Sequence, residues 1–152
     1  MVSTKLEEKT ILDWKEKLRP YICPFEDILN EIGERKSVFD IGCGQGGLLL
    51  LCANKLRPTK IAGIEINKEL VNRAQKTLSG IEIPSFISIY DGYKIPNEVS
   101  EYDVITMIDV LHHIPQNRQL LFIDQLIMKM RKGSKLVVKD IDAKDPLVYF
   151  NK

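Results

Sequence analysis

The sequence predicts an α/β fold built on a parallel sheet, and two features of the chain support this. Short apolar runs rich in Val and Ile recur along it, and most are separated by a stretch with helical apolar spacing. Strands that are joined by helices or long crossovers form parallel sheets covered on both faces. At 152 residues, the chain is long enough for one such domain.

The first 36 residues predict two helices that precede the sheet. The first apolar stripe at helical spacing is formed by Ile11, Trp14 and Leu18. Two prolines interrupt it, and a second stripe then ends at Gly33, formed by Phe25, Ile28, Leu29 and Ile32. We interpret 1–36 as a helical lid or cap segment on a single domain, 37–152. For Trp14 we favour core packing over the covering of a ligand.

From residue 37 onward, strands and helices alternate. The expected strands are 37–41, 60–66, 85–90, 102–108 and 134–141. The expected helices run from the glycine-rich turn to Leu56, over 67–78 with Asn67 as the N-cap, and over 116–132. The last ten residues, "AKDPLVYFNK", predict the start of a helix with an apolar face formed by Leu147, Val148 and Phe150.

Composition excludes several classes of partner. The 22 basic and 21 acidic side chains give a net charge of +1, so no overall field attracts nucleic acid or a membrane surface. Three cysteines without paired spacing indicate reduced thiols rather than a disulfide scaffold. The N-terminus is charged throughout, and no apolar run approaches the ~20 residues of a membrane span. We therefore expect a cytoplasmic protein with no nucleic-acid partner.

A glycine-rich turn, "FDIGCGQGG", follows the first expected strand. Its Gly42, Gly44 and Gly47 satisfy the dinucleotide spacing G-x-G-x-x-G, and Glu65 lies about 20 residues further on, where a ribose-binding acid is expected. These features alone do not separate a nicotinamide dinucleotide from other nucleoside cofactors. Asp40, however, stands beside the turn and would oppose a pyrophosphate.

Each expected strand delivers a carboxylate to the same edge of the sheet, where ligands of such sheets bind. The acids are Asp40, Glu65, Asp91, Asp109, Asp140 and Asp142. Like charges gathered in one cleft repel each other unless a cation lies among them. The pattern therefore favours S-adenosylmethionine, which carries a sulfonium and an amino group and no phosphate.

The motifs also carry a resemblance. "VFDIGCGQGG", "IAGIEIN", "YDG" and "YDVITMIDVLHHIP" occur in the order and spacing of the class I S-adenosylmethionine-dependent methyltransferases, and the chain resembles that family from Ser37 to Asp142. The resemblance implies a Rossmann-like doubly wound sheet of order 3-2-1-4-5 in an S-adenosylmethionine-binding domain, 37–152. It further implies methyl transfer to a small-molecule acceptor, with S-adenosylhomocysteine as the product and no metal.

The resemblance also implies roles for individual residues. Asp40, Gly42 and Gly44 would line the methionine moiety, with Asp109 beside it. Glu65 would bind both ribose hydroxyls, and Ile66 would pack on the adenine. Asp91 would meet the adenine amino group, and Gly92 would let the backbone approach it. Asp140 and Asp142 are weaker candidates that would face either the acceptor or solvent.

The two histidines of the chain, His112 and His113, follow the fourth expected strand. Imidazole exchanges protons near neutral pH, so either side chain could accept a proton from the acceptor. The alternative is that they pack or position the substrate.

Three other functions stay open at this point. They are an NAD(P)-dependent oxidoreductase using the same turn, a cofactor-binding module without catalysis, and a divalent-metal site on the acids with Lys139 beside it.

The family's sheet has two further strands, for which we count no residues. Either the chain is a fragment of a longer protein, which we favour, or a second copy covers the open edge of the fifth strand in a homodimer.

Overall fold

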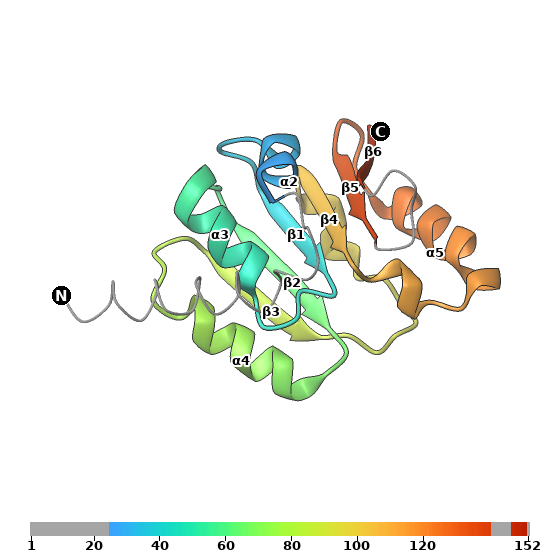
Figure 1. Cartoon of the computed structure of the whole chain (residues 1–152), viewed down its shortest axis with the longest axis horizontal. Helices are drawn as coiled ribbons and strands as arrows, with labels where there is room; N and C mark the ends of the chain where they lie inside the picture. The colour runs from blue at the N-terminus through green and yellow to red at the C-terminus, as the bar shows by residue number, and fades with distance from the viewer. Residues whose placement is uncertain (1–24, 141–146, 152) are drawn as a thin grey trace.

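The structure is a computed structural model that describes residues 25–140 and 147–151. It contains a six-stranded sheet in the order β3-β2-β1-β4-β5-β6 with helices on both faces (Figure 1). The first five strands are all parallel, which confirms the predicted order 3-2-1-4-5. They are β1 (Val38–Ile41), β2 (Ile61–Glu65), β3 (Ser85–Ile89), β4 (Val104–Ile108) and β5 (Lys135–Lys139).

The helices lie where the apolar spacing predicted them. They are α2 (Phe25–Ile32), α3 (Gly47–Leu56), α4 (Lys68–Leu78) and α5 (Gln116–Lys129). Asn67 caps α4 as expected, since its side chain accepts hydrogen bonds from the backbone N–H groups of Glu69 and Leu70. Two short 3-10 helices were not predicted, η1 (Asn97–Glu101) and η2 (Leu111–His113). No helix within 25–140 or 147–151 is both long and apolar enough to span a membrane.

The prediction for the C-terminal tail was wrong. Residues Leu147–Asn151 form a strand, β6, which pairs antiparallel with β5 from Lys139↔Leu147 to Lys135↔Asn151. The run "LVYF" consists mostly of β-branched and aromatic residues, which fit a pleated sheet, and the edge of β5 offers unpaired backbone groups. We counted no residues for a further strand, whereas the edge of β5 is paired within the chain.

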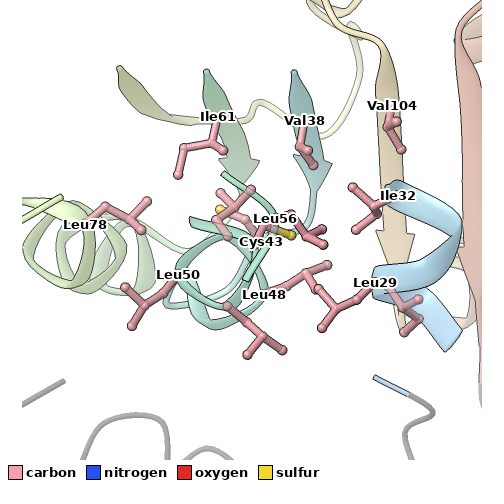
Figure 2. Close-up of a cluster of buried hydrophobic side chains, with 14 of the residues drawn as sticks. Leu29, Ile32, Val38, Cys43, Leu48, Leu50, Leu56, Ile61, Leu78 and Val104 are labelled. Carbon is pink, nitrogen blue, oxygen red and sulfur yellow. The ribbon is translucent and has the colours of Figure 1, made fainter. Parts of the chain in front are cut away.

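The core lies on both faces of the sheet. On one face α2, α3 and α4 pack a cluster that includes Leu29, Ile32, Leu48, Leu56 and Leu78 against β1 and β2 (Figure 2). On the other face, α5 contributes Leu126 to a second cluster, its C-cap residue Met130 joins it, and η1 contributes Val99. Because α2 supplies core side chains, the described part of the predicted 1–36 segment is packed into the domain. The expected helix with Ile11, Trp14 and Leu18 lies outside the described residues, as do Cys23 and Asp142.

Cys43 is part of the glycine turn, and its side chain belongs to the first cluster (Figure 2). A Cβ at Gly63 would lie 2.7 Å from the Cβ of Cys43, so β2 and the turn approach each other closely at this point. Burial raises the pKa of the Cys43 thiol, with the Asp40 charge adding to the effect. Cys43 therefore has the properties of a small buried side chain and not those of a reactive thiolate.

Candidate functional site

The glycine turn is held against β2 by two hydrogen bonds. The N–H groups of Gly42 and Cys43 donate to the carbonyl oxygen of Ile64, at 2.8 and 3.0 Å. Gly42 and Gly44 have φ values of +71° and +54°, a backbone conformation that favours glycine. A Cβ at Gly42 would lie 2.4 Å from Val110 Cγ2, whereas a Cβ at Gly44 would meet nothing within 4 Å. Gly42 therefore permits close packing, and Gly44 leaves open space above the turn.

Glu65, at the end of β2, connects this turn to α4. Its Oε2 accepts a hydrogen bond from Gly44 N at 3.0 Å, and its Oε1 accepts one from Asn67 N at 3.0 Å. These contacts fix the carboxylate at the carboxyl end of the sheet, which is where the sequence predicted a ribose-binding acid.

A cavity of about 450 Å³ opens beside Glu65. Six of the residues that we predicted for the site line it, namely Gly42, Glu65, Ile66, Gly92, Asp109 and His113. Much of the remaining wall is apolar and includes Ile41, Ile64, Leu70, Val110 and Phe122. An apolar wall with a few fixed polar groups and this volume suits a nucleoside-sized ligand.

Asp40 does not line this cavity. It is 4% exposed within β1, and its Oδ1 accepts a hydrogen bond of 2.6 Å from Thr106 Oγ1 on β4. Burial raises the pKa of Asp40 from 3.8 to about 7, the Thr106 hydrogen bond opposes that rise, and the Glu65 charge adds to it. The Asp40 side chain therefore joins β1 to β4 just before the turn, and with this pKa it is only partly ionised at neutral pH.

Asp109 lines the cavity, but its charge is paired. Lys139 Nζ at the end of β5 lies 2.7 Å from Asp109 Oδ1 and 3.0 Å from Oδ2. We expected Lys139 beside the acids but could not assign it this partner from the sequence, because the pair depends on the alignment of β4 with β5.

Asp91 does not line the cavity, and it is exposed. Its Oδ1 accepts hydrogen bonds from the N–H groups of Tyr93 at 2.8 Å and Lys94 at 3.0 Å. The hydrogen bond from Lys94, followed by that from Tyr93, holds the pKa of Asp91 below its usual range. Two of the predicted acids, Glu65 and Asp109, line the cavity. Of these, Glu65 is the one whose carboxylate forms no ion pair with a lysine or arginine of the described residues.

The two histidines have different surroundings. His113 lines the cavity. His112 does not, and its Nδ1 lies 3.0 Å from Asp140 Oδ1 while its N–H donates to Asp140 Oδ2 at 3.1 Å. The two imidazole rings are tilted against each other with centroids 4.0 Å apart.

The contribution of α5 and of the residue that follows β3 to the cavity was not predicted from the sequence. One face of α5 lines the cavity, formed by Arg118, Leu121, Phe122 and Gln125 at positions i, i+3, i+4 and i+7. This spacing predicts a core-facing stripe equally well, so the pattern alone could not assign it to a ligand. Tyr90 also lines the cavity, and its buried hydroxyl has no hydrogen-bond partner among the described residues.

Metal ligands do not gather within 25–140 and 147–151, since no group of three or more His, Cys, Asp or Glu side chains there is arranged to hold an ion. Asp109 is paired with Lys139, and Asp40 is buried within β1. The predicted acids therefore do not form one cluster.

Comparison with known proteins identifies the same architecture. A family model described as "Methyltransferase domain" matches residues 14–149. The chain is 30% identical over 114 residues to (S)-tetrahydroprotoberberine N-methyltransferase of Eschscholzia californica. The aligned region covers 75% of this chain and 32% of that protein. It is 25% identical over 109 residues to fatty-acid O-methyltransferase of Mycolicibacterium smegmatis. Here the aligned region covers 70% of this chain and 38% of that protein.

A solved structure gives the same result for the fold. The chain is similar to a SAM-dependent methyltransferase from Aquifex aeolicus with a TM-score of 0.68 and 21% identity, over 91% of this chain and 77% of that one. The chain spans about a third of the length of the two curated relatives above.

Proposed function

The chain belongs to the class I S-adenosylmethionine-dependent methyltransferase family, and from this premise we propose that it binds S-adenosylmethionine and transfers the methyl group to a small-molecule acceptor. The single observation that carries the proposal is the placement of Glu65. Its carboxylate is fixed by Gly44 N and Asn67 N on the wall of a largely apolar cavity of about 450 Å³.

The residues of the cavity fit this cofactor. Glu65 would accept hydrogen bonds from the ribose hydroxyls, and Ile66, which is 63% exposed, would pack on the adenine. The open space above Gly44 would admit the methionine moiety. Gly92 lies on the cavity wall, where its backbone could approach the adenine edge. When bound, S-adenosylmethionine supplies a methyl group made electrophilic by its sulfonium.

The remaining predicted residues support the site in different ways. Asp40, hydrogen-bonded to Thr106, would hold the glycine turn in place, and Asp109 would present a lysine-paired carboxylate beside the methionine moiety. Asp91 would reach the adenine amino group only if its turn with Tyr93 and Lys94 changed. His112 and His113 follow β4 on the acceptor side, where either could remove a proton.

A nicotinamide dinucleotide fits the same cavity less well. Its pyrophosphate would lie at the glycine turn, where Glu65 already accepts the Gly44 N–H that a phosphate oxygen would need. The relatives named above act on nitrogen in one case and oxygen in the other, so they leave the acceptor atom open.

The proposal is tested by calorimetric titration with S-adenosylmethionine, S-adenosylhomocysteine and NADH. We expect both sulfur nucleosides to bind, and Glu65→Ala to weaken binding by roughly 10- to 100-fold, because a hydrogen bond to a charged group contributes about 1.5–3 kcal/mol. Glu69→Ala is the matched control, since Glu69 lies exposed on α4 and pairs with Arg73. Binding of NADH without binding of S-adenosylmethionine would contradict the proposal.

Turnover separates an enzyme from a module that only binds the cofactor. Labelled methyl groups should appear in at least one acceptor of a chemically varied panel. Full affinity for the cofactor together with no transfer to any acceptor would favour the binding module.

A further inference from the structure

We propose that the side of the cofactor cavity formed by α5 binds the methyl acceptor, that this acceptor is an apolar molecule with a carboxylate, and that Arg118 binds that carboxylate. The inference rests on the function proposed above and names the chemical class of its acceptor. The α5 wall of the cavity consists of Arg118, Leu121, Phe122 and Gln125.

The proposed cofactor contacts leave the α5 wall free. They come from the glycine turn, from the ends of β2 and β4 and from the loop after β3, and none of them comes from α5. His113, Ile114 and Pro115 continue the wall of the same cavity from the end of β4 into α5. An acceptor bound on the α5 wall would therefore share one cavity with the cofactor.

Arg118 has no acidic partner within the part of the chain that the structure describes. It is the one lysine or arginine among the described residues that line the cavity, and it forms no ion pair with another of them. Residues three and four positions apart are neighbours on a helix, and those that follow Arg118 at this spacing are Leu121 and Phe122. Both are apolar, so the guanidinium is available to a ligand.

Two further observations indicate a positive potential at this wall. Helix α5 begins after Pro115 with no side-chain cap and no acidic residue in its first turn, so neither offsets the positive end of its dipole. Arg118 also acts on Tyr90, which lines the same cavity. Burial and then the Asp91 charge raise the pKa of Tyr90, and the Arg118 charge opposes this rise. The field of the guanidinium therefore reaches the cavity wall.

The acids of the cavity leave room for an anionic ligand. Asp109 is neutralised by Lys139, whose Nζ lies 2.7 Å from Oδ1, and Glu65 accepts hydrogen bonds from two backbone N–H groups. The sulfonium of bound S-adenosylmethionine adds a positive charge that also attracts an anion. A guanidinium matches a carboxylate with two parallel hydrogen bonds, so Arg118 favours an acid over an amine.

Apolar side chains beside Arg118 favour an apolar body for this acid. Leu121 is 54% exposed and Tyr93 is 75% exposed, and both line the cavity. Phe122 lies next to Leu121 on the α5 wall. A ligand that covers these side chains removes apolar surface from water, which stabilises the complex. The wall therefore combines one cation with an apolar surface.

The first experiment uses three probes with one carbon skeleton, namely phenylacetate, phenylacetamide and phenethylamine. Calorimetry first establishes S-adenosylhomocysteine binding; its failure would overturn the proposed function and this inference together. With S-adenosylhomocysteine bound, phenylacetate should bind about tenfold more tightly than phenylacetamide, and phenethylamine should bind most weakly. Equal binding of the acid and the amide, tightest binding of the amine, or binding of none of the three would overturn the inference and leave the cofactor assignment intact.

The second experiment changes the charge at position 118. Arg118→Met should remove the preference for phenylacetate over phenylacetamide, and Arg118→Lys should retain part of it. Arg118→Glu should make phenethylamine the tightest of the three probes. Arg73→Met is the matched control and should keep the wild-type preference, since Arg73 lies exposed on α4 and pairs with Glu69. A wild-type preference in Arg118→Met would overturn the inference.

A third experiment separates the carboxylate of the acceptor from that of the cofactor. S-adenosylhomocysteine has an amino-acid carboxylate, whereas methylthioadenosine has the same nucleoside without the amino acid. Arg118→Met should bind both compounds as tightly as the wild type does. A loss of affinity for S-adenosylhomocysteine alone would show that Arg118 binds the cofactor, and would overturn the assignment of Arg118 to the acceptor.

Turnover gives a readout that a merely structural role would not move. In a panel of apolar acids, each paired with its amide, labelled methyl should appear in at least one acid. Arg118→Met should raise KM for that acid by about tenfold and change kcat far less, because a binding contact that is equal in the ground state and the transition state affects KM. Transfer to the amides alone, or to no member of the panel, would overturn the inference.

Discussion

Lys139 and Asp109 form an ion pair between the ends of β5 and β4, with Nζ–O distances of 2.7 and 3.0 Å. The pair is reinforced by the backbone, since Asp109 N donates to Lys139 O at 2.7 Å and Asp109 has a φ of +55°. The Lys139 side chain is 4% exposed and that of Asp109 is 26% exposed. The lysine is thus the more deeply buried charge, and it neutralises one of the carboxylates that the sequence placed at the cavity.

Separating this pair should destabilise the protein. Lys139→Met and Asp109→Asn should each lower the free energy of unfolding by about 2–4 kcal/mol, because each leaves a buried charge without its partner. Asp109→Asn should have the larger effect, since it leaves the more deeply buried Lys139 unpaired. Urea denaturation measures both variants.

The control is Arg73→Met, which breaks the exposed pair with Glu69 and should change stability by less than about 0.5 kcal/mol. A Lys139→Met variant as stable as the wild type would contradict the stabilising role of the pair.

The pKa of Asp40 makes a second prediction, on the pH dependence of stability. Its pKa is 3.8 when unperturbed and about 7 in the folded protein. Between these values the folded state holds a proton that the unfolded state has lost. The protonated Asp40 therefore contributes fully to the free energy of unfolding below pH ~4, and this contribution is lost as pH rises to about 7. The free energy of unfolding falls over this range by up to about 1.4 kcal/mol per pH unit.

Asp40→Asn removes this titration while keeping an oxygen that can accept the Thr106 hydrogen bond. Relative to the wild type, the variant should gain stability as pH rises from 5 to about 7, the folded pKa, and the difference should then level off. Urea unfolding midpoints at pH 5, 6, 7 and 8 give the comparison. Two curves that stay parallel over this range would show that Asp40 titrates normally.

The features that depend on a few neighbouring residues were predictable from the sequence. Asn67 as a cap of α4 and the stripe of α2 ending at Gly33 were both confirmed. The parallel strands start and end within two residues of the predicted bounds. In each case one local pattern, such as a cap or an apolar period, determines the structure.

The features that depend on distant residues were not predictable in this way. Asp109 is neutralised by Lys139, which is 30 residues away in the chain and adjacent only once β4 and β5 pair. The tail forms β6 because the edge of β5 is available, although its apolar residues also suit a helix face. Similarly, Phe122 on α5 has the spacing of a core residue, and it lines the cavity because of how α5 packs.

Replacing two glycines of the turn by alanine, one at a time, should have different effects on the stability of the protein. Gly42→Ala should destabilise the protein, because its Cβ would lie 2.4 Å from Val110 Cγ2 in addition to the strain of a positive φ. Gly44→Ala should lose only about 1 kcal/mol from its φ of +54°, since no atom lies within 4 Å of the new Cβ.

The affinity for S-adenosylmethionine should show the opposite order, with the larger loss in Gly44→Ala. The Gly44→Ala methyl group would occupy the open space above the turn, so affinity for S-adenosylmethionine should fall by more than stability does. Thermal unfolding and calorimetry measure the two effects, and Gly42→Ala combined with Val110→Ala should recover part of the lost stability. Normal cofactor affinity in a folded Gly44→Ala variant would show that no ligand lies over the turn.

Tyr90 gives the last prediction, because its hydroxyl is buried without a hydrogen-bond partner among the described residues. Burial raises the pKa of the phenol, so the hydroxyl keeps its hydrogen at neutral pH, and the Tyr90 side chain lines the cavity. Tyr90→Phe should leave the stability of the ligand-free protein unchanged or raise it by up to about 1 kcal/mol, because an unsatisfied polar group is removed. If the hydroxyl serves the cofactor, the same variant should weaken S-adenosylmethionine binding by roughly tenfold, the usual contribution of one hydrogen bond. Denaturation and calorimetry on one preparation separate the two effects, and a loss of stability with unchanged affinity would show that the hydroxyl has a structural partner instead.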